Sequence, residues 1–344
     1  MMFNSKEHNN VLRSLLETRT AQNRIPIWFM RQAGRYLPEY QEEMHDVTNF
    51  LQACYDIARV EKITLQPINR FDLDAAIIFS DIMTLPDAMG FKVDFPRGHA
   101  PKVSFQNRQK NNIERTIEIL SPVLESIHRV RKKLAKNKEL IGFIGAPWTL
   151  ATYILGKEKN AKELILQHRA GDRTLQNLID ELIEYSIMFL AKQAAAGADI
   201  LQIFDSHAGD LPHDLFISFV LEPTHKIVKA LKKTHPQTYI IGFPKGAGTL
   251  YNLYAKASGV DATSIDYTVQ PSWVRGNIAG IVQGNLDPAV VAHDADLAIS
   301  QTKNILENLS SNPLIFNLGH GILPNTPPHH IELIVETVRN YSRR

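Results

Sequence analysis

The sequence predicts an α/β protein in which eight parallel strands close into a single (β/α)8, or TIM, barrel. Apolar, β-branched runs recur eight times along the 344 residues, and helical patterns separate most of them. Several runs are apolar almost throughout, which is typical of strands that are covered on both faces. Eight repeats without a break in composition favour a closed barrel over a doubly wound open sheet.

Each predicted strand leads into a polar or glycine-containing turn. The strands are expected at Ile25–Met30, Ala75–Ser80, Leu140–Gly145, Asp199–Phe204, Thr238–Phe243, Ala262–Tyr267, Ile278–Gln283 and Leu314–Leu318. Helices are expected at Asn49–Arg70, Ile113–Lys136, Thr174–Ala196, Pro212–Thr234, Ala289–Leu309 and from about Pro328 to Tyr341. The connections after the fifth and sixth strands are short, and their helical patterns are the weakest.

The chain is predicted to be one domain, residues 1–344, with residues 1–10 as a flexible tail. No linker rich in Pro, Gly or Ser and no low-complexity tract interrupts it. The one long insert without a helical pattern, Phe91–Asn112, follows the second strand. Within it, Val93–Val103 has the alternation of a short hairpin.

The charge balance argues against a nucleic-acid or membrane partner. Lys and Arg number 38 against 36 Asp and Glu, a formal charge of +2, so any anion binding must come from local clustering. Cys54 is the only cysteine, which excludes an internal disulfide and a site with several thiolates. Its helical surroundings predict a buried thiol. Without a signal-peptide pattern or a long apolar stretch, the expected location is the cytoplasm.

The first predicted strand leads directly into two arginines, Arg31 and Arg35. Two guanidinium groups four residues apart at a strand exit can hold carboxylates or phosphates in a fork geometry. Gly34 between them permits a tight turn or a close backbone approach to a ligand. Solvated surface charges are the alternative interpretation, but the apolar strand that anchors this loop favours an anion site.

The active site of such a barrel lies at the carboxyl ends of the strands, and all eight exits here carry polar or glycine-rich residues. Asp81 follows the second strand and could also merely cap a turn. His320 lies between two glycines, which indicates a site residue. Ser206 stands beside His207, but the G-x-S-x-G elbow of a hydrolase is missing. Tyr153, in a helix opened by Pro147, could belong to the core instead.

The turn Lys245–Gly248 after the fifth strand could cradle a phosphate. It lacks the length and the Ser or Thr of a P-loop, so this signal is weak.

Several segments resemble the uroporphyrinogen decarboxylase family. Pro26–Tyr40, with its Met-Arg-Gln-Ala-Gly-Arg-Tyr core, and Gly142–Tyr153 are similar to the two signature segments of that family. Further similar segments are Phe79–Asp81, Phe204–Gly209, Gln283–Pro288 and Leu318–Gly321. Together they run from about residue 11 to residue 340 in family order.

The resemblance implies a (β/α)8 barrel, usually a homodimer, that uses neither metal nor organic cofactor. Such an enzyme removes CO2 from the four acetate side chains of uroporphyrinogen III to give coproporphyrinogen III in haem biosynthesis. It also implies that Asp81 faces the pyrrole N–H groups and that the arginines bind carboxylates. The implied substrate-binding residues are Arg31, Gln32, Ala33, Gly34, Arg35, Asp81, Tyr153, Ser206 and His320, with Asp81 and Arg31 as catalytic residues.

One departure from the family pattern is Tyr267, where many members have Trp, so contacts at that strand end stay open. The proton donor also stays open. Arg31 has a pKa too high for an ordinary general acid, yet no other residue of the motifs is an obvious substitute.

Two alternatives to the decarboxylase are a corrinoid- or thiol-dependent methyltransferase of the same barrel superfamily and a non-catalytic tetrapyrrole-binding protein. The methyltransferases hold a zinc ion, normally with His and Cys ligands, and Cys54 is expected to lie far from any strand exit. A carrier would not need Asp81 beside both arginines.

Overall fold

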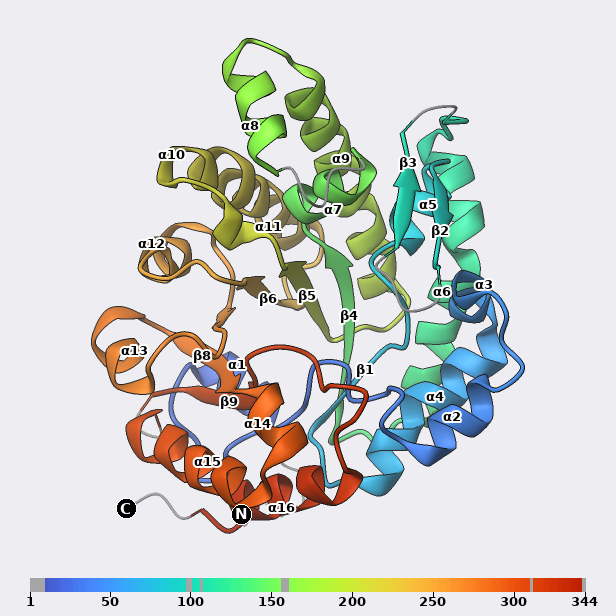
Figure 1. Ribbon diagram of the computed structural model, residues 1–344. Helices are drawn as coiled ribbons and strands as arrows, with labels where there is room; N and C mark the ends of the chain where they lie inside the picture. Colours follow the sequence, from blue (N-terminus) through green and yellow to red (C-terminus); the bar gives the residue numbers. More distant parts are fainter. Residues whose placement is uncertain (1–9, 97–100, 106–107, 156–160, 310–311, 342–344) are drawn as a thin grey trace, which may run out of the picture.

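The computed structural model describes residues 10–96, 101–105, 108–155, 161–309 and 312–341 (Figure 1). Seven parallel strands form a curved sheet in the order β1-β4-β5-β6-β7-β8-β9, and β2 and β3 form a separate hairpin. The barrel strands are β1 (Ala75–Ile77), β4 (Glu139–Gly145), β5 (Ile200–Asp205), β6 (Tyr239–Pro244), β7 (Ala262–Ser264), β8 (Ile281–Leu286) and β9 (Leu314–Leu318). The predicted tail, apart from Asn10, lies outside the described residues.

Helices cover the outside of the sheet and connect its strands, as the alternating pattern predicts (Figure 1). They are α1 (Val11–Thr18), α2 (Pro38–Met44), α3 (Phe50–Tyr55), α4 (Ile57–Arg70), α5 (Thr84–Ala88), α6 (Ile113–Lys133), α7 (Pro147–Ile154), α8 (Ala161–Arg169), α9 (Thr174–Ala195), α10 (His213–Phe216), α11 (Glu222–Thr234), α12 (Leu250–Ala257), α13 (Pro271–Asn277), α14 (Pro288–His293), α15 (Ala295–Leu309) and α16 (Pro328–Arg339).

Three predicted helices are divided. The helix expected at Asn49–Arg70 breaks at Asp56, whose carboxylate accepts the Arg59 N–H and caps α4. The helix expected at Ala289–Leu309 breaks at Asp294, which accepts the Leu297 N–H in the same way. The helix expected at Pro212–Thr234 is divided by a π-helical turn, Ile217–Leu221, which separates α10 from α11. In the first two cases the apolar periodicity predicts one continuous helix, but a capping carboxylate within the pattern begins a new one.

The first predicted strand, Ile25–Met30, differs most from expectation, because it forms only an isolated bridge between Ile27 and Phe316 of β9. Its carbonyl groups still pair on both sides: Pro26 O accepts the Phe316 N–H, and Ile27 O accepts the Asp74 N–H, at 2.8 Å each. The segment therefore closes the ring between β9 and β1 without a regular ladder.

Side chains satisfy N–H groups of this segment in place of a ladder. The Ile27 N–H donates to the Asp74 carboxylate at 2.7 Å, the Phe29 N–H to Gln32 at 3.1 Å and the Met30 N–H to Asn317 at 3.0 Å. Pro26 has no N–H to donate. These side-chain acceptors explain why the apolar run does not form a full strand.

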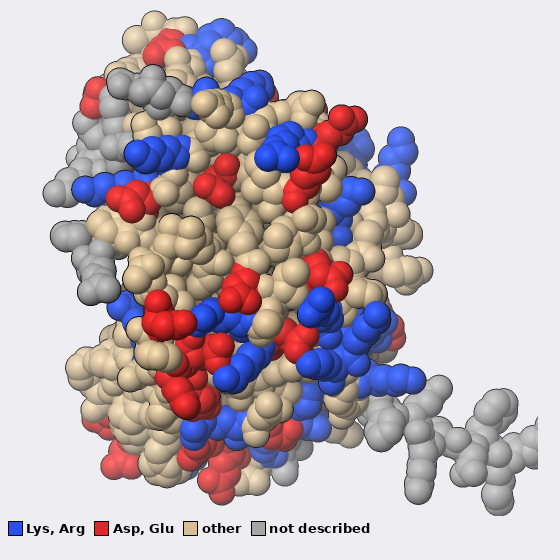
Figure 2. Space-filling model, turned by 90° about the vertical axis from the view of Figure 1, so that its right-hand side faces the viewer, with Lys and Arg blue, Asp and Glu red and all other residues tan. Residues whose placement is uncertain are grey.

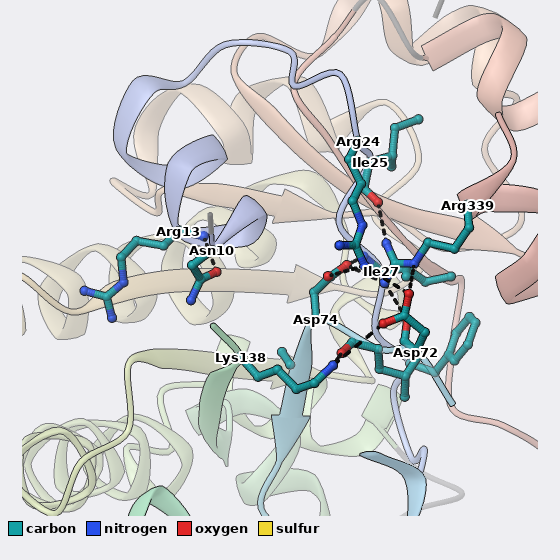
Figure 3. Close-up of polar contacts among 12 residues, drawn as sticks. Asn10, Arg13, Arg24, Ile25, Ile27, Asp72, Asp74, Lys138 and Arg339 are labelled. Atoms are coloured by element: carbon teal, nitrogen blue, oxygen red, sulfur yellow. Dashed lines mark hydrogen bonds and ion pairs between the residues drawn. The ribbon is translucent and has the colours of Figure 1, made fainter. Parts of the chain in front are cut away.

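Asp74 connects this closing segment to the far end of the chain (Figure 3). Besides the Ile27 N–H, its buried carboxylate receives Arg339 of α16 at 3.0 Å and Arg24 at 3.3 Å. Burial raises the pKa of Asp74, and the two guanidinium groups and the Ile27 N–H oppose that shift. Asp72, which is exposed, also pairs with Arg24 and Arg339, so one cluster joins the segment before β1, the closing segment and the last helix.

Helix α1, which the sequence reading did not assign, closes the amino end of the barrel. Leu12, Leu15 and Leu16 are buried in the cluster that fills the barrel interior. Arg13 pairs with Glu139 at the start of β4 and with Asp199 just before β5, at 2.9 and 3.0 Å. The opposite end of the barrel, formed by the carboxyl ends of the strands, is where barrels of this kind have their active site.

The predicted hairpin is confirmed: β2 (Lys92–Asp94) pairs antiparallel with β3 (Lys102–Ser104), and residues 97–100 between them lie outside the described part. Three strands differ from their predicted bounds by three residues, and β1 is one of them, since it ends at Ile77 and not at Ser80. β8 begins at Ile281, three residues later than predicted, because α13 runs to Asn277 and Gly280 turns with a φ of +88°. β7 is shorter than predicted and ends at Ser264.

Charges of both signs lie side by side on the face formed by α2, α4 and α6 (Figure 2). Ion pairs there join Arg70 to Glu39, Arg59 to Asp46 and Lys133 to Glu61. Among the described residues, no helix is long and apolar enough to cross a membrane.

Replacing Asp74 with Ala should destabilise the fold strongly, because the Ile27 N–H and a largely buried Arg339 lose their acceptor. We expect a loss of about 3 kcal/mol in the free energy of unfolding, measured by urea denaturation. Asp74→Asn keeps an acceptor for the Ile27 N–H and should lose less.

Asp72→Ala is the matched control. Its carboxylate contacts the same two arginines but is 59% exposed, so we expect a loss below about 1 kcal/mol. Equal losses for Asp74→Ala and Asp72→Ala would show that Asp74 does not anchor the closing segment.

Candidate active site

The loop after the closing segment presents two arginines without partners. Arg31 adopts the left-handed region with a φ of +57°, and both Arg31 and Arg35 are exposed. Within the described part of the chain, neither guanidinium group forms a hydrogen bond or an ion pair. Gly34 is buried and packs against the Arg31 backbone, where an added Cβ would lie 3.4 Å from its carbonyl oxygen. The loop thus offers two free cations at the barrel mouth.

Gln32, expected to contact the substrate, is instead fully buried and holds this loop together. Its side chain accepts the Phe29 N–H and donates to the Ala75 carbonyl of β1, both at 3.1 Å, and its carbonyl accepts the Tyr36 hydroxyl at 2.8 Å. Ala33 beside it is half-buried. In this arrangement the Gln32 side chain positions the arginines, and direct contact of Gln32 or Ala33 with a ligand stays a prediction.

Asp81 lies just beyond β1, half-buried at the same mouth. One carboxylate oxygen accepts the Met83 N–H at 2.9 Å, so the predicted turn-capping role is present. No cation pairs with it directly among the described residues. Burial raises the pKa of Asp81 to about 6, although the Met83 N–H and the nearby charge of Arg31 oppose the shift. A half-buried carboxylate with spare acceptor capacity is suited to bind N–H donors of a ligand.

His320 lies at the exit of β9, and the next residue, Gly321, packs against Arg31. An added Cβ on Gly321 would lie 3.0 Å from Arg31 Cβ, so the glycine permits this approach. The His320 ring lies 6.3 Å from the ring of Phe243, on β6. Burial lowers the pKa of His320 to about 4, and the charges of Lys245 and Arg31 lower it further. The imidazole is therefore neutral at physiological pH and can donate or accept a hydrogen bond.

Aromatic side chains form an apolar layer beneath these polar groups. Phe143, Phe204 and Phe243 come from the neighbouring strands β4, β5 and β6, and their rings meet edge to face at 5.6 and 6.3 Å. Phe143 and Phe204 are half-buried. The mouth therefore combines an apolar floor with a charged rim, which suits an amphipathic ligand with anionic arms.

Tyr153 and Ser206 lie at the exits of β4 and β5. Tyr153 is on α7 as predicted, half-buried, with its ring 5.5 Å from that of His207. His207 pairs through Nδ1 with Asp210 at 3.1 Å, and no hydrogen bond joins it to Ser206 among the described residues. A Ser-His-Asp triad is therefore not formed here, in agreement with the missing elbow.

Asp205, at the end of β5, and Asp266, shortly after β7, are buried, and their carboxylates accept hydrogen bonds from the protein itself. Asp266 accepts hydrogen bonds from Gly246 N, Tyr251 Oη, Thr268 N and Thr268 Oγ1; burial opposes its charge, but these donors lower its pKa. In the described part of the chain the Asp205 carboxylate accepts only from Thr149, at 2.5 Å, and burial raises the pKa of Asp205 to about 7.

Cys54 corrects one expectation, since the thiol is not far from the site. It is buried on α3 as predicted, but the charge of Asp81 is close enough to raise its pKa, after the larger effect of burial. Among the described residues, no three His, Cys, Asp or Glu side chains gather into a group that could hold a metal ion. The absence of a cofactor from the reaction stays a prediction.

Sequence reasoning missed one residue of the mouth. Lys245 was weighed only as part of a weak phosphate loop, yet its charge acts on His320. Its position just after a predicted strand is the signal that could have indicated a residue of the mouth, since the carboxyl ends of barrel strands surround the site.

These features are those of a (β/α)8-barrel enzyme whose mouth carries exposed cations. A family model for uroporphyrinogen decarboxylase (URO-D) matches residues 8–341, and the chain belongs to this family. Uroporphyrinogen decarboxylase of Orientia tsutsugamushi (strain Ikeda) is 46% identical, over 93% of this chain and 95% of that protein. The enzyme of the same name from Wolbachia sp. subsp. Brugia malayi (strain TRS) is 44% identical, over 92% of each chain.

Solved structures with a similar fold include a methyltransferase from Methanosarcina mazei. It has a TM-score of 0.76 and 18% identity, covering 96% of this chain and 98% of that one. A B12-independent methionine synthase from Shewanella sp. W3-18-1 has a TM-score of 0.58 and 12% identity, covering 83% and 87%. At these identities the likeness extends to the fold alone.

Replacing Asp81 with Asn should stabilise the protein at high pH. The folded-state pKa of about 6 lies above the ordinary value of 3.8, so the native state binds more protons and wild-type stability falls as the pH rises from about 4 to about 6. At pH 8 Asp81→Asn should be more stable by roughly 1–3 kcal/mol, and at pH 4 the two should unfold alike.

Thermal and urea denaturation at both pH values measure this difference. Asp94→Asn, on the exposed strand β2, removes the same charge and should unfold like the wild type at pH 4 and at pH 8. A stability gain of Asp81→Asn that does not change with pH would contradict the raised pKa.

Proposed function

We propose that this chain converts uroporphyrinogen III to coproporphyrinogen III, removing four CO2 by a carboxy-lyase reaction without a cofactor. Its family membership supports this proposal. The observation that carries it is the half-buried Asp81 carboxylate, on which the charge of Arg31 acts. Among the residues that the structure describes, neither Asp81 nor Arg31 forms an ion pair. A substrate with anionic arms and central pyrrole N–H groups supplies carboxylates for Arg31 and hydrogen-bond donors for Asp81.

Binding follows from the arrangement of the rim and the floor. Arg31 and Arg35 hold carboxylates of the substrate through charge-assisted hydrogen bonds. The pyrrole rings lie toward Phe143 and Phe204, while Asp81 accepts their N–H groups. Neutral His320, Tyr153 and Ser206 donate hydrogen bonds to further carboxylates at the rim.

The substrate supplies its own electron sink. Protonation of the pyrrole carbon that bears the acetate arm makes the ring cationic. The bond between the arm and its carboxylate then breaks, CO2 leaves, and the electron pair moves into the ring. A second proton on the exocyclic carbon and loss of the first restore the pyrrole and leave a methyl group, so one proton is consumed for each CO2.

Asp81 stabilises the cationic ring in this sequence because its charge is fixed in place before the reaction. Preorganised groups of this kind contribute about 3–4 kcal/mol to transition-state stabilisation. The anion is required, so kcat/KM should fall as the pH drops through about 6, the pKa of Asp81 in the free protein. We assign Arg31 to the catalytic machinery beside Asp81, because its charge acts on this carboxylate.

We also propose that the chain is a single domain, forms a homodimer and acts in the cytoplasm. The resemblance to the family supports the dimer, and the unbroken succession of strands and helices supports one domain. Sedimentation equilibrium should give twice the 38.9 kDa chain mass. A single monomeric species at micromolar concentration would contradict the dimer.

Asp81→Asn should decarboxylate uroporphyrinogen at least a hundredfold more slowly than the wild type. The variant keeps the shape and the Met83 contact but loses the charge, which corresponds to about 3 kcal/mol of transition-state stabilisation. The assay is anaerobic turnover, with products separated by their number of carboxylates. Near-normal turnover by the variant would disprove the electrostatic role of Asp81.

The same assay separates the decarboxylase from the two alternatives. We expect prolonged EDTA treatment and Cys54→Ala each to leave the wild-type turnover intact. Activity that disappears on chelation and returns with Zn2+ would favour the methyltransferase. Tight porphyrinogen binding without any CO2 release would favour a carrier.

Arg35→Lys should weaken substrate binding, because Lys keeps the charge but loses the planar fork of the guanidinium group. We expect KM for the octacarboxylate to rise about tenfold while kcat changes less. The control is Arg129→Lys, an exposed arginine on α6 that pairs only with Glu125. An unchanged KM for Arg35→Lys would show that Arg35 makes no two-point contact with a carboxylate.

A further inference from the structure

Lys245 is a cation of the barrel mouth that no motif of the sequence identified. It follows directly on β6 and is half-buried. Within the described part of the chain, its ammonium group forms neither an ion pair nor a hydrogen bond. By contrast Lys232, also half-buried, pairs with Asp261 at 2.6 Å. A partly desolvated lysine without a partner is costly unless a ligand supplies the missing anion.

Lys245 stands at the exit of β6, across the mouth from the exit of β9, where His320 lies. β6 and β9 are separated in the sheet by β7 and β8, so residues at their exits meet only over the barrel interior. Phe243, near the end of β6, reaches the His320 ring at 6.3 Å, so side chains of these two exits approach each other there. The charge of Lys245 lowers the pKa of this same histidine, second only to burial.

The backbone around Lys245 is held rigidly. Its N–H donates to the Asp205 carbonyl at 3.0 Å, and its carbonyl accepts the Gly209 N–H at 2.9 Å. The next N–H, of Gly246, donates to the Asp266 carboxylate at 2.5 Å. A Cβ on Gly209 would lie 2.6 Å from the Gly246 carbonyl oxygen, so the two loops depend on glycine to pack this closely.

The carboxylate of Asp266 accepts the N–H of Gly246, the residue after Lys245, yet no ion pair joins it to Lys245 among the described residues. Its oxygens already accept four hydrogen bonds, from Gly246, Tyr251 and both the amide and the hydroxyl of Thr268. The acceptor capacity of Asp266 is thus taken by the scaffold, and the ammonium group stays available.

We propose that Lys245 is a further substrate-binding residue, which holds a carboxylate arm of the substrate on the side of the mouth opposite Arg31 and Arg35. This inference rests on the proposed function, because it needs a ligand with several anionic arms. The two arginines and the lysine then hold the macrocycle from two sides, and neutral His320 lies between them. An octacarboxylate has enough arms for all three cations.

Binding of uroporphyrin III, the oxidised macrocycle with the same eight carboxylates, tests this role without turnover. Lys245→Met should bind it about tenfold more weakly than the wild type, a difference of about 1.4 kcal/mol. Lys245→Arg should restore most of the affinity. Lys229→Met, on the exposed face of α11, removes the same charge far from the strand exits and should bind like the wild type.

A second readout tests the geometry without any ligand. In NMR titrations the pKa of His320 should rise in Lys245→Met and stay near 4 in Lys229→Met, because, of these two lysines, Lys245 is the one whose charge acts on the ring. If Lys245 had only a structural role, replacing it would not raise the pKa of His320 in a protein that stays folded.

The outcomes separate the two proposals. Wild-type turnover with equal uroporphyrin affinity in Lys245→Met and the wild type would overturn the role of Lys245 and leave the decarboxylase intact. A wild type that neither binds uroporphyrin nor releases CO2 from uroporphyrinogen would overturn both.

Discussion

The carboxylate of Asp74 is the contact on which the closed barrel depends. The segment Ile25–Met30 has too few main-chain partners to hold its place as an eighth strand, and Asp74 supplies one acceptor while drawing in Arg24 and Arg339. The same segment leads into Arg31 and Arg35. The position of the anion-binding loop at the carboxyl end of the barrel is therefore fixed by an ion cluster near the start of the strands.

Hydrogen-bond saturation distinguishes the carboxylates of the mouth. Asp266 accepts four hydrogen bonds, which lower its pKa and commit it to holding the loop of Gly246. Asp81 accepts one, from Met83, and burial raises its pKa to about 6. Two aspartates at strand exits thus serve different purposes, because one is satisfied by the protein and the other is left for a ligand.

The unpaired groups of the mouth carry a cost in stability. Burial and the charges of Lys245 and Arg31 lower the pKa of His320, while Asp81 is ionised although burial opposes its charge. A ligand with several carboxylates and central N–H donors pairs with the cations and with Asp81 at the same time, and so removes this cost. Affinity for such a ligand then arises from groups that the fold leaves unsatisfied, as is common where function opposes stability.

The sequence alone determined the strand–helix succession, the hairpin and the placing of Asp81 and His320 at strand exits, because these depend on periodicity and local order. It predicted Ile25–Met30 as a full strand and Cys54 as remote. Only the tertiary structure decided those points, showed that the Gln32 side chain is bonded within its own loop, and brought the charge of Lys245 to act on His320. Burial, hydrogen-bond saturation and proximity across the barrel depend on residues that are far apart in the chain. A local sequence pattern therefore cannot predict them.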